Sequence, residues 1–67
     1  SQFKLSRTPI TSTIKVSVRN QVVPRSRKDG FDYDPASRTI VFYGNTYRPK
    51  QGDQVFISYR VWKGSLG

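Results

Sequence analysis

Short runs in which apolar and polar side chains alternate are the feature that most constrains this chain. The clearest run is Ile14-Lys15-Val16-Ser17-Val18-Arg19, and two others cover residues 39–43 and 54–62. Alternation with a period of two places one set of side chains on each face of an extended strand. Residues 3–5, 21–23 and 31–33 are shorter candidates of the same kind. Helix signals are almost absent, so the sequence predicts an all-β fold.

Turn-forming residues separate these runs. Arg19-Asn20 lies between two apolar stretches, and Asn tolerates the left-handed backbone of a tight hairpin. Asp34-Pro35-Ala36-Ser37 fits a type I turn in which Asp34 caps the backbone. Gly44-Asn45 and residues 49–53 bracket a longer loop. Turns at this spacing predict a small antiparallel β-sandwich or partly open barrel of about six or seven short strands.

A chain of 67 residues has room for one domain with one core. We expect residues 1–63 to form this domain and residues 64–67 to begin a linker or disordered tail. The inward-facing positions of the expected strands give the predicted core: Phe3, Leu5, Ile14, Val16, Val18, Val23, Tyr33, Ile40, Phe42, Val55, Ile57, Tyr59 and Val61.

Besides Phe31, four aromatic residues lie outside this predicted core: Tyr43, Tyr47, Phe56 and Trp62. Exposed aromatic side chains are common in binding hot spots, so these residues are candidates for a contact patch. In a domain this small, however, we expect Phe56 and Trp62 to pack under a loop, or against a second sheet or a neighbouring domain.

Missing residue types argue against an enzyme. The chain has no Cys and no His, and all four of its acidic residues are Asp. The absence of Cys excludes a disulfide framework and a thiol nucleophile, and the absence of His removes the commonest general base and transition-metal ligand. No phosphate loop or dinucleotide-binding motif is present either. We expect a protein without catalysis or cofactor, and the lack of a long apolar run predicts no membrane insertion.

Positive charge is the strongest functional signal. Twelve Lys and Arg residues against four Asp residues give a formal net charge of +8. Basic residues interleaved with aromatic ones attract phosphates and stack on unpaired bases, and positive charge also favours an acidic protein or polysaccharide. The alternative is a solvated surface with no specific partner. The candidate basic and aromatic face comprises Arg25, Arg27, Lys28, Tyr47, Arg48, Lys50, Arg60, Trp62 and Lys63.

Three carboxylates close together, Asp29, Asp32 and Asp34, form a weak candidate for a calcium site. Their spacing lacks the Glu ligand and the twelve-residue frame of an EF-hand. Turn chemistry explains them better: Asp34 caps its turn, and Asp32 faces outward opposite a nearby Arg. We therefore expect no metal.

Several motifs occur along the chain in a fixed order. They are Phe-x-Leu-x-x-x-Pro at residues 3–9, an aromatic pair before an Asp turn at residues 30–36, Ile-x-Phe at residues 40–42 and Pro-x-x-Gly-Asp at residues 49–53. In this order they resemble the small β-modules appended to bacterial von Willebrand factor type A domain proteins and repeated in phage tail-fibre and minor tail proteins. Arg19-Asn20 replaces the usual Asn-Gly turn, which predicts a wider hairpin, and Phe31 replaces a common Trp.

The resemblance implies a structural or adhesive role on an extracellular surface or virion, and it names no ligand. The leading hypothesis is a non-catalytic adhesion or assembly module of a larger protein that binds neighbouring domains or other copies through its basic, aromatic face. The alternative is a small nucleic-acid-binding β-domain that uses the same residues. A third possibility is an oligomerising unit whose strand edges pair between copies.

Overall fold

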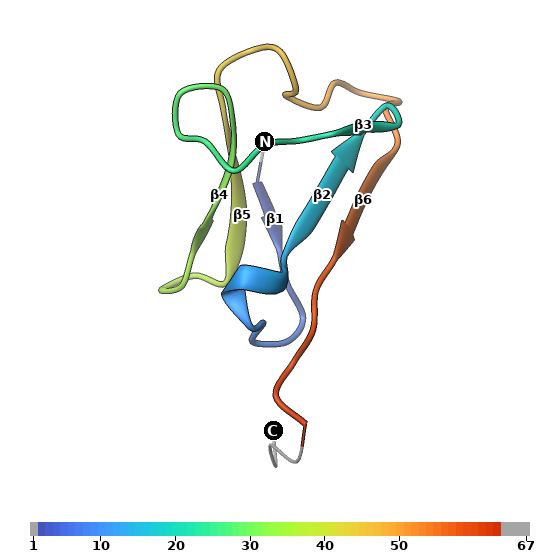
Figure 1. The fold of residues 1–67 in the computed structure, drawn as a ribbon. Helices are drawn as coiled ribbons and strands as arrows, with labels where there is room; N and C mark the ends of the chain where they lie inside the picture. Colours follow the sequence, from blue (N-terminus) through green and yellow to red (C-terminus); the bar gives the residue numbers. More distant parts are fainter. Residues whose placement is uncertain (1, 64–67) are drawn as a thin grey trace.

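Six short strands and one 3-10 turn make up the computed structural model, which describes residues 2–63 (Figure 1). The strands pair in two antiparallel three-stranded sheets of order β1-β5-β4 and β3-β2-β6. The predicted all-β fold is confirmed, whereas the predicted tail at residues 64–67 lies outside the described residues. No helix in the described part of the chain is long and apolar enough to cross a membrane. The elements are β1 (Gln2–Lys4), η1 (Thr11–Thr13), β2 (Lys15–Val18), β3 (Gln21–Val22), β4 (Gly30–Asp34), β5 (Thr39–Tyr43) and β6 (Val55–Ser58).

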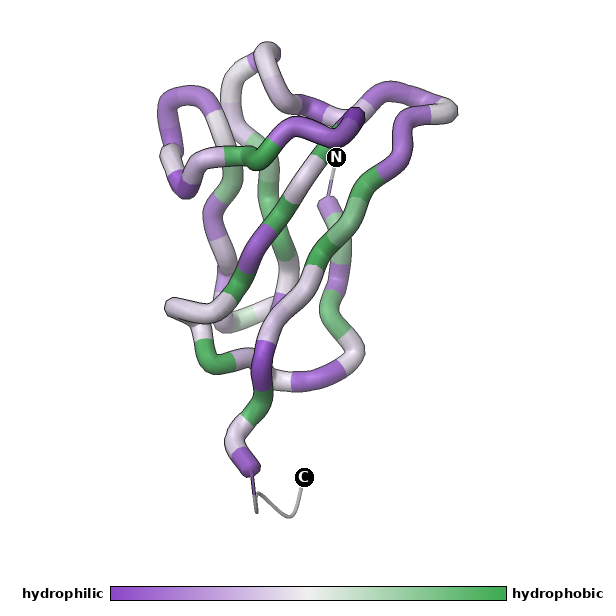
Figure 2. The backbone as a smooth tube through the Cα atoms, turned by 45° about the vertical axis from the view of Figure 1, so that its right-hand side comes forward, coloured by the Kyte–Doolittle hydropathy of each residue, from purple (hydrophilic) through white to green (hydrophobic). Residues whose placement is uncertain are grey.

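The core lies between the two sheets. Figure 2 shows apolar positions alternating with polar ones along β2, as expected for a strand with one buried face. The pattern along β2 buries Val16 and Val18 and leaves Lys15 exposed. The buried apolar side chains are Leu5, Ile14, Val16, Val18, Val23, Phe31, Tyr33, Ile40 and Phe42. All of these except Phe31 are predicted core residues.

The remaining predicted core residues are only half-buried. Phe3 of β1 and Val55 and Ile57 of β6 pack against the core from strands at the edges of the sheets, as does Tyr59 just beyond β6. Val61 is half-buried as well. An edge strand has a neighbour on one side only, and therefore its inward side chains keep part of their contact with solvent.

Two expectations about aromatic residues are wrong within this chain. Phe56 and Trp62 do not pack, because 58% and 67% of their surfaces are exposed. Tyr47, in contrast, packs against the core from the loop between β5 and β6. Within residues 2–63, these two large aromatic side chains are therefore mostly exposed to solvent.

The chain crosses from one sheet to the other directly after β3. The backbone N–H of Val23 donates to the carbonyl of Val16 on β2 at 2.9 Å. Next, the carbonyl of Pro24 accepts from the N–H of Phe31, and the N–H of Ser26 donates to the carbonyl of Phe31, both at 3.0 Å. Residues 23–26 thus bond first to β2 and then to β4, which closes this side of the sandwich. On the other side, β1 and β6 are both sheet edges.

The β2–β3 hairpin is tight, so the predicted wider turn is wrong. Val18 pairs directly with Gln21, and both intervening residues have positive φ, at 52° for Arg19 and 64° for Asn20. A two-residue loop of this kind is the type I′ turn that fits the twist of paired strands. The Arg19 guanidinium holds the turn in place by donating to the Asp53 carboxylate at 2.6 Å and to the Thr46 carbonyl at 2.9 Å.

Strand β6 ends at Ser58 and is shorter than the predicted run of residues 54–62. Strand β2 begins at Lys15, opposite Ser58, so the chain beyond Ser58 has no strand to pair with. It bonds to residues near η1 instead: the N–H of Arg60 donates to Thr13 Oγ1 at 2.9 Å, and the N–H of Ile10 donates to the Arg60 carbonyl at 2.7 Å.

Candidate functional site

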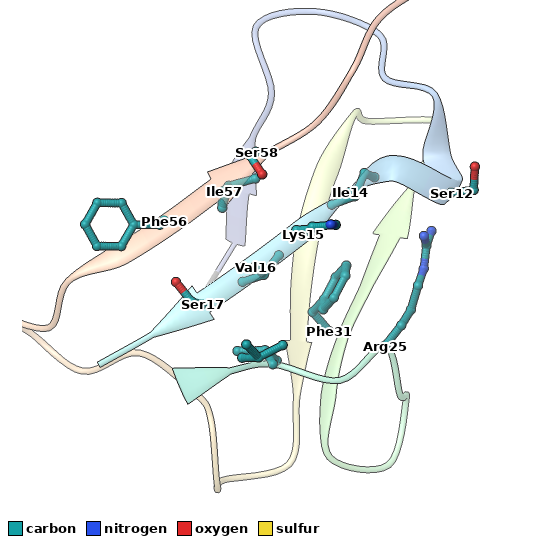
Figure 3. A pocket seen from close by; sticks show the side chains of 12 residues that line it. Ser12, Ile14, Lys15, Val16, Ser17, Arg25, Phe31, Phe56, Ile57 and Ser58 are labelled. Carbon is teal, nitrogen blue, oxygen red and sulfur yellow. The ribbon is translucent and has the colours of Figure 1, made fainter. Parts of the chain in front are cut away.

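A groove of about 670 Å³ opens where β2 and the chain after β3 diverge (Figure 3). Ile14, just before β2, and Val16 of β2 lie along one wall, and the Phe31 ring lies between β2 and the opposite sheet. Ligand sites in proteins commonly combine such an apolar lining with a few polar groups. The lining residues are Ser12, Ile14, Lys15, Val16, Ser17, Val22, Val23, Arg25, Phe31, Phe56, Ile57 and Ser58.

Strand register extends this groove across the outer face of the β3-β2-β6 sheet. Ser17 of β2 lies directly opposite Val22 of β3 on one side and Phe56 of β6 on the other. Val22 is 82% exposed, and Phe56 is also exposed. Two large apolar side chains therefore flank a small one in a single row across three strands. We call Val22, Ser17 and Phe56 the outer row.

Two basic residues border the groove, and they differ in whether their charged groups already have partners within the protein. Arg25 is held within the fold: its Nη1 donates to the Thr11 carbonyl at 2.6 Å, and its guanidinium carbon lies 5.6 Å from the centre of the Phe31 ring. Lys15 is exposed and forms no ion pair with any residue in the range 2–63. Lys15 is therefore the cation that the groove leaves available to a partner.

The nine residues of the predicted basic and aromatic face come from three segments of the chain, of which the first two are joined by the bond from the Thr46 N–H to Asp29. Arg25, Arg27 and Lys28 lie between β3 and β4, Tyr47, Arg48 and Lys50 lie in the loop between β5 and β6, and Arg60, Trp62 and Lys63 follow β6. In Figure 1 the second group is at the top of the molecule and the third is near the bottom. Of the nine, only Arg25 lines the groove.

Arg27 and Arg25 both bind Asp32 on β4. Arg27 Nε lies 2.7 Å from Asp32 Oδ2, and Arg25 Nε lies 3.3 Å from Asp32 Oδ1. The hydrogen bond from Arg27, followed by the one from the backbone N–H of Tyr33, lowers the pKa of Asp32. The same pairing raises the pKa of Arg27. The prediction that Asp32 faces an Arg is confirmed, and these two cations are already partly compensated.

The three candidate calcium ligands have different partners, and no group of carboxylates suited to a metal ion exists within residues 2–63. Asp29 accepts from the backbone N–H of Thr46 at 3.1 Å. Asp34 accepts from Ser37 Oγ at 2.7 Å and from the N–H of Ala36 at 3.3 Å. The structure therefore does not bring these three carboxylates together, and the predicted capping role of Asp34 is confirmed.

Arg48 stabilises the loop between β5 and β6. Its Nε donates to the Gly44 carbonyl at 3.0 Å, and its Nη2 donates to the Phe42 carbonyl at 3.1 Å. Asp53 fixes the other end of this loop through Arg19 and through the backbone N–H of Lys50, which lies 2.8 Å from Asp53 Oδ2. The bond from Lys50 and then the bond from Arg19 lower the pKa of Asp53.

These two lowered pKa values predict acid-sensitive stability. Below the usual carboxylate pKa of about 3.9, the unfolded chain binds protons that folded Asp32 and Asp53 do not yet bind. Their contribution to the free energy of unfolding is thus fully present above about pH 5 and is lost as the pH falls through the lowered values. We expect Asp32→Asn to weaken this pH dependence, as measured by urea unfolding between about pH 7 and pH 2.

Arg27→Gln is the matched control, because it removes the largest cause of the lowered Asp32 pKa and keeps the carboxylate. It is expected to reduce the acid-dependent loss of stability in the same direction as Asp32→Asn. The slope that remains in Asp32→Asn is assigned to Asp53, whereas Arg27→Gln also keeps the part of the slope that comes from the bonds of Tyr33 and Arg25 to Asp32. If Asp32→Asn follows the wild-type pH profile, the ion pairs of Asp32 make no contribution to stability.

Lys15, Ser17 and Val22 were not among the predicted site residues, whereas Phe56 was named as a candidate for a contact patch. Alternation along residues 14–19 gives the signal that would have found Lys15 and Ser17, because it places them opposite the core face. Comparison of the chain with protein-family models, curated proteins and solved structures finds no match. The candidate site therefore rests on its own geometry.

Proposed function

We propose that this chain is a non-catalytic structural, adhesion or assembly module, and that it binds an acidic partner protein through the groove and the outer row. The observation that carries the proposal is the exposed apolar row beside an unpaired cation: Val22 and Phe56 flank Ser17, and Lys15 lies on the same strand as Ser17. Exposed apolar residues grouped in this way are typical of interaction sites on soluble proteins.

The chemistry of the site selects a class of partner. The apolar lining favours an aromatic or aliphatic side chain, and Lys15, on a chain of net charge +8, favours carboxylates beside it. We infer that the partner presents an apolar side chain flanked by acidic residues. An extracellular or virion location, and binding to neighbouring domains or other copies of a parent assembly, follow from the sequence resemblance and belong to the same proposal.

A peptide titration tests this proposal. The probe is the capped hexapeptide acetyl-Glu-Asp-Leu-Phe-Glu-Asp-amide, with binding followed by amide chemical shifts in the 15N-labelled protein. We expect the largest shifts around the outer row and a loss of affinity of about tenfold for Phe56→Ser, because a hot-spot aromatic side chain is removed. Lys15→Ala should weaken binding several-fold, and Lys50→Ala, which removes the same charge from the β5–β6 loop, should leave it unchanged.

Competing explanations give different results in the same titration. If Lys15→Ala and Lys50→Ala reduce the affinity for the peptide equally, net charge alone attracts the peptide, and the groove proposal fails. A fluorescent single-stranded oligonucleotide and heparin serve as further probes. The nucleic-acid alternative would be favoured if the oligonucleotide binds at about 150 mM salt, heparin does not displace it and Trp62→Ala weakens its binding.

A further inference from the structure

Strand β6 forms an open edge of the β3-β2-β6 sheet. Its only neighbour in sheet order among the described residues is β2, with Val18 opposite Val55 and Lys15 opposite Ser58. Figure 1 shows β6 at the outer side of this sheet. An unprotected edge of this kind offers a row of backbone donors and acceptors to another strand.

Two backbone hydrogen bonds establish which backbone groups of β6 face outward. The N–H of Arg19 donates to the Gln54 carbonyl at 3.1 Å, and on the other side of β2 the N–H of Val23 donates to the Val16 carbonyl at 2.9 Å. Antiparallel ladders alternate, so the N–H and C=O groups of Phe56 and Ser58 face β2. Those of Val55 and Ile57 consequently point away from β2, along the open edge.

The edge lacks the usual features that prevent strand pairing. Residues 55–59, Val-Phe-Ile-Ser-Tyr, contain no Pro and no charged side chain, whereas natural edges are commonly protected by Lys or Pro. The inward-facing Val55, Ile57 and Tyr59 remain half-buried, as does Phe3 of β1. A strand added to β6 would therefore gain backbone hydrogen bonds and cover apolar surface at the same time.

Charge selects the occupant of this edge. The four carboxylates of the chain already have partners: Asp32 and Asp53 bind Arg residues, and Asp29 and Asp34 accept hydrogen bonds within loops. Lys4 on β1 and Arg60 beyond β6 are both exposed. A second copy would bring another net charge of +8 to the same edge, which is unfavourable, whereas an acidic strand would be attracted.

We propose that β6 accepts an extended segment of an acidic partner chain as an added strand. Apolar side chains at alternate positions of that segment would cover Val55, Ile57 and Tyr59, and carboxylates at the intervening positions would face solvent and the basic surface. The edge shares strand β6 with the groove and the outer row, because Ile57 also lines the groove and Phe56 belongs to the outer row. Strand addition uses the outward backbone groups of Val55 and Ile57, whereas the groove and the outer row bind through side chains. Either proposal can therefore fail while the other stands.

Amide hydrogen exchange in the 15N-labelled chain tests strand addition. The probe is a capped peptide of alternating valine and glutamate residues. In the free protein, the amides of Val55 and Ile57 should exchange faster than those of Phe56 and Ser58. At saturating peptide, we expect exchange at Val55 and Ile57 to slow by roughly tenfold or more, with little change at Phe56 and Ser58.

Two altered peptides supply the controls. N-methylation at alternate peptide bonds removes the donors that an added strand needs and should abolish protection at Val55 and Ile57. Replacing glutamate by lysine keeps strand propensity and reverses the charge, and should abolish binding. Protection by the N-methylated peptide, or equal binding of the lysine peptide, would overturn the proposal. The amides of Val55 and Ile57 could also exchange slowly in the free protein, and more slowly as the protein concentration rises. That result would show self-association through this edge and would overturn the proposal as well.

Val55→Pro provides an independent test in the protein. The N–H of Val55 does not face β2, so proline at the start of β6 removes an outward donor and leaves the ladder with β2 intact. We expect this variant to lose binding of the valine–glutamate peptide and to keep binding of the acetyl-Glu-Asp-Leu-Phe-Glu-Asp-amide probe at the outer row. Unchanged binding of the valine–glutamate peptide would contradict strand addition.

Discussion

Replacing Ile40 by Ala is expected to leave a large part of this protein unfolded at 25 °C. Ile40 is fully buried in β5, the middle strand of its sheet. It pairs with Phe3 of β1 on one side and Tyr33 of β4 on the other. Removing a buried aliphatic side chain costs about 2–5 kcal/mol, which approaches the whole stability of a domain this small.

Chemical unfolding followed by far-UV circular dichroism measures this loss. Val22→Ala is the matched control, because it also shortens an aliphatic strand residue but at a position that is 82% exposed. We expect the control to stay within about 0.5 kcal/mol of the wild type. If Ile40→Ala lowers the free energy of unfolding by less than about 1 kcal/mol, the core can collapse around the missing side chain, which would contradict tight packing between the sheets.

The strands and most of the core could be predicted because alternation is a local signal. Residues 14–19 and 39–43 show in the sequence alone which side chains share a face. Phe31 was missed although the same signal includes it, because it lies two positions before the predicted core residue Tyr33 and therefore shares its face of β4. The turn at Arg19-Asn20 was also misjudged, because the bonds from Arg19 to the distant loop at Thr46 and Asp53 are not visible locally.

The candidate site was harder to predict because it depends on register between strands. Val22, Ser17 and Phe56 form one row only when β3, β2 and β6 are aligned as the structure aligns them. The predicted basic face grouped residues that are similar in chemistry, yet residues 47–50 and 60–63 lie at opposite ends of the molecule (Figure 1). Several of those arginines also have internal partners, which composition does not reveal.

Gly30→Ala is expected to destabilise the fold by about 3 kcal/mol through crowding alone. Gly30 is buried at the start of β4, and a Cβ atom there would collide with the Pro24 carbonyl oxygen and lie 3.1 Å from the backbone N of Ser26. These atoms belong to the backbone of the crossing segment, which bonds to Phe31 through Pro24 and Ser26. The methyl group can be accommodated only if that segment moves away from β4.

Gly52→Ala is the control that separates steric crowding from the backbone strain of placing a side chain at positive φ. Gly52 has a φ of +92°, where a side chain is unfavourable, but a Cβ atom there would meet nothing within 4 Å. We expect Gly52→Ala to lower the free energy of unfolding by about 1 kcal/mol, measured by the same chemical unfolding, and Gly30→Ala to lower it clearly more. Equal losses would mean that residues 24–26 can move without cost. Because those residues hold Arg25 over Phe31, the groove would then be a flexible opening instead of the fixed surface that the binding proposal requires.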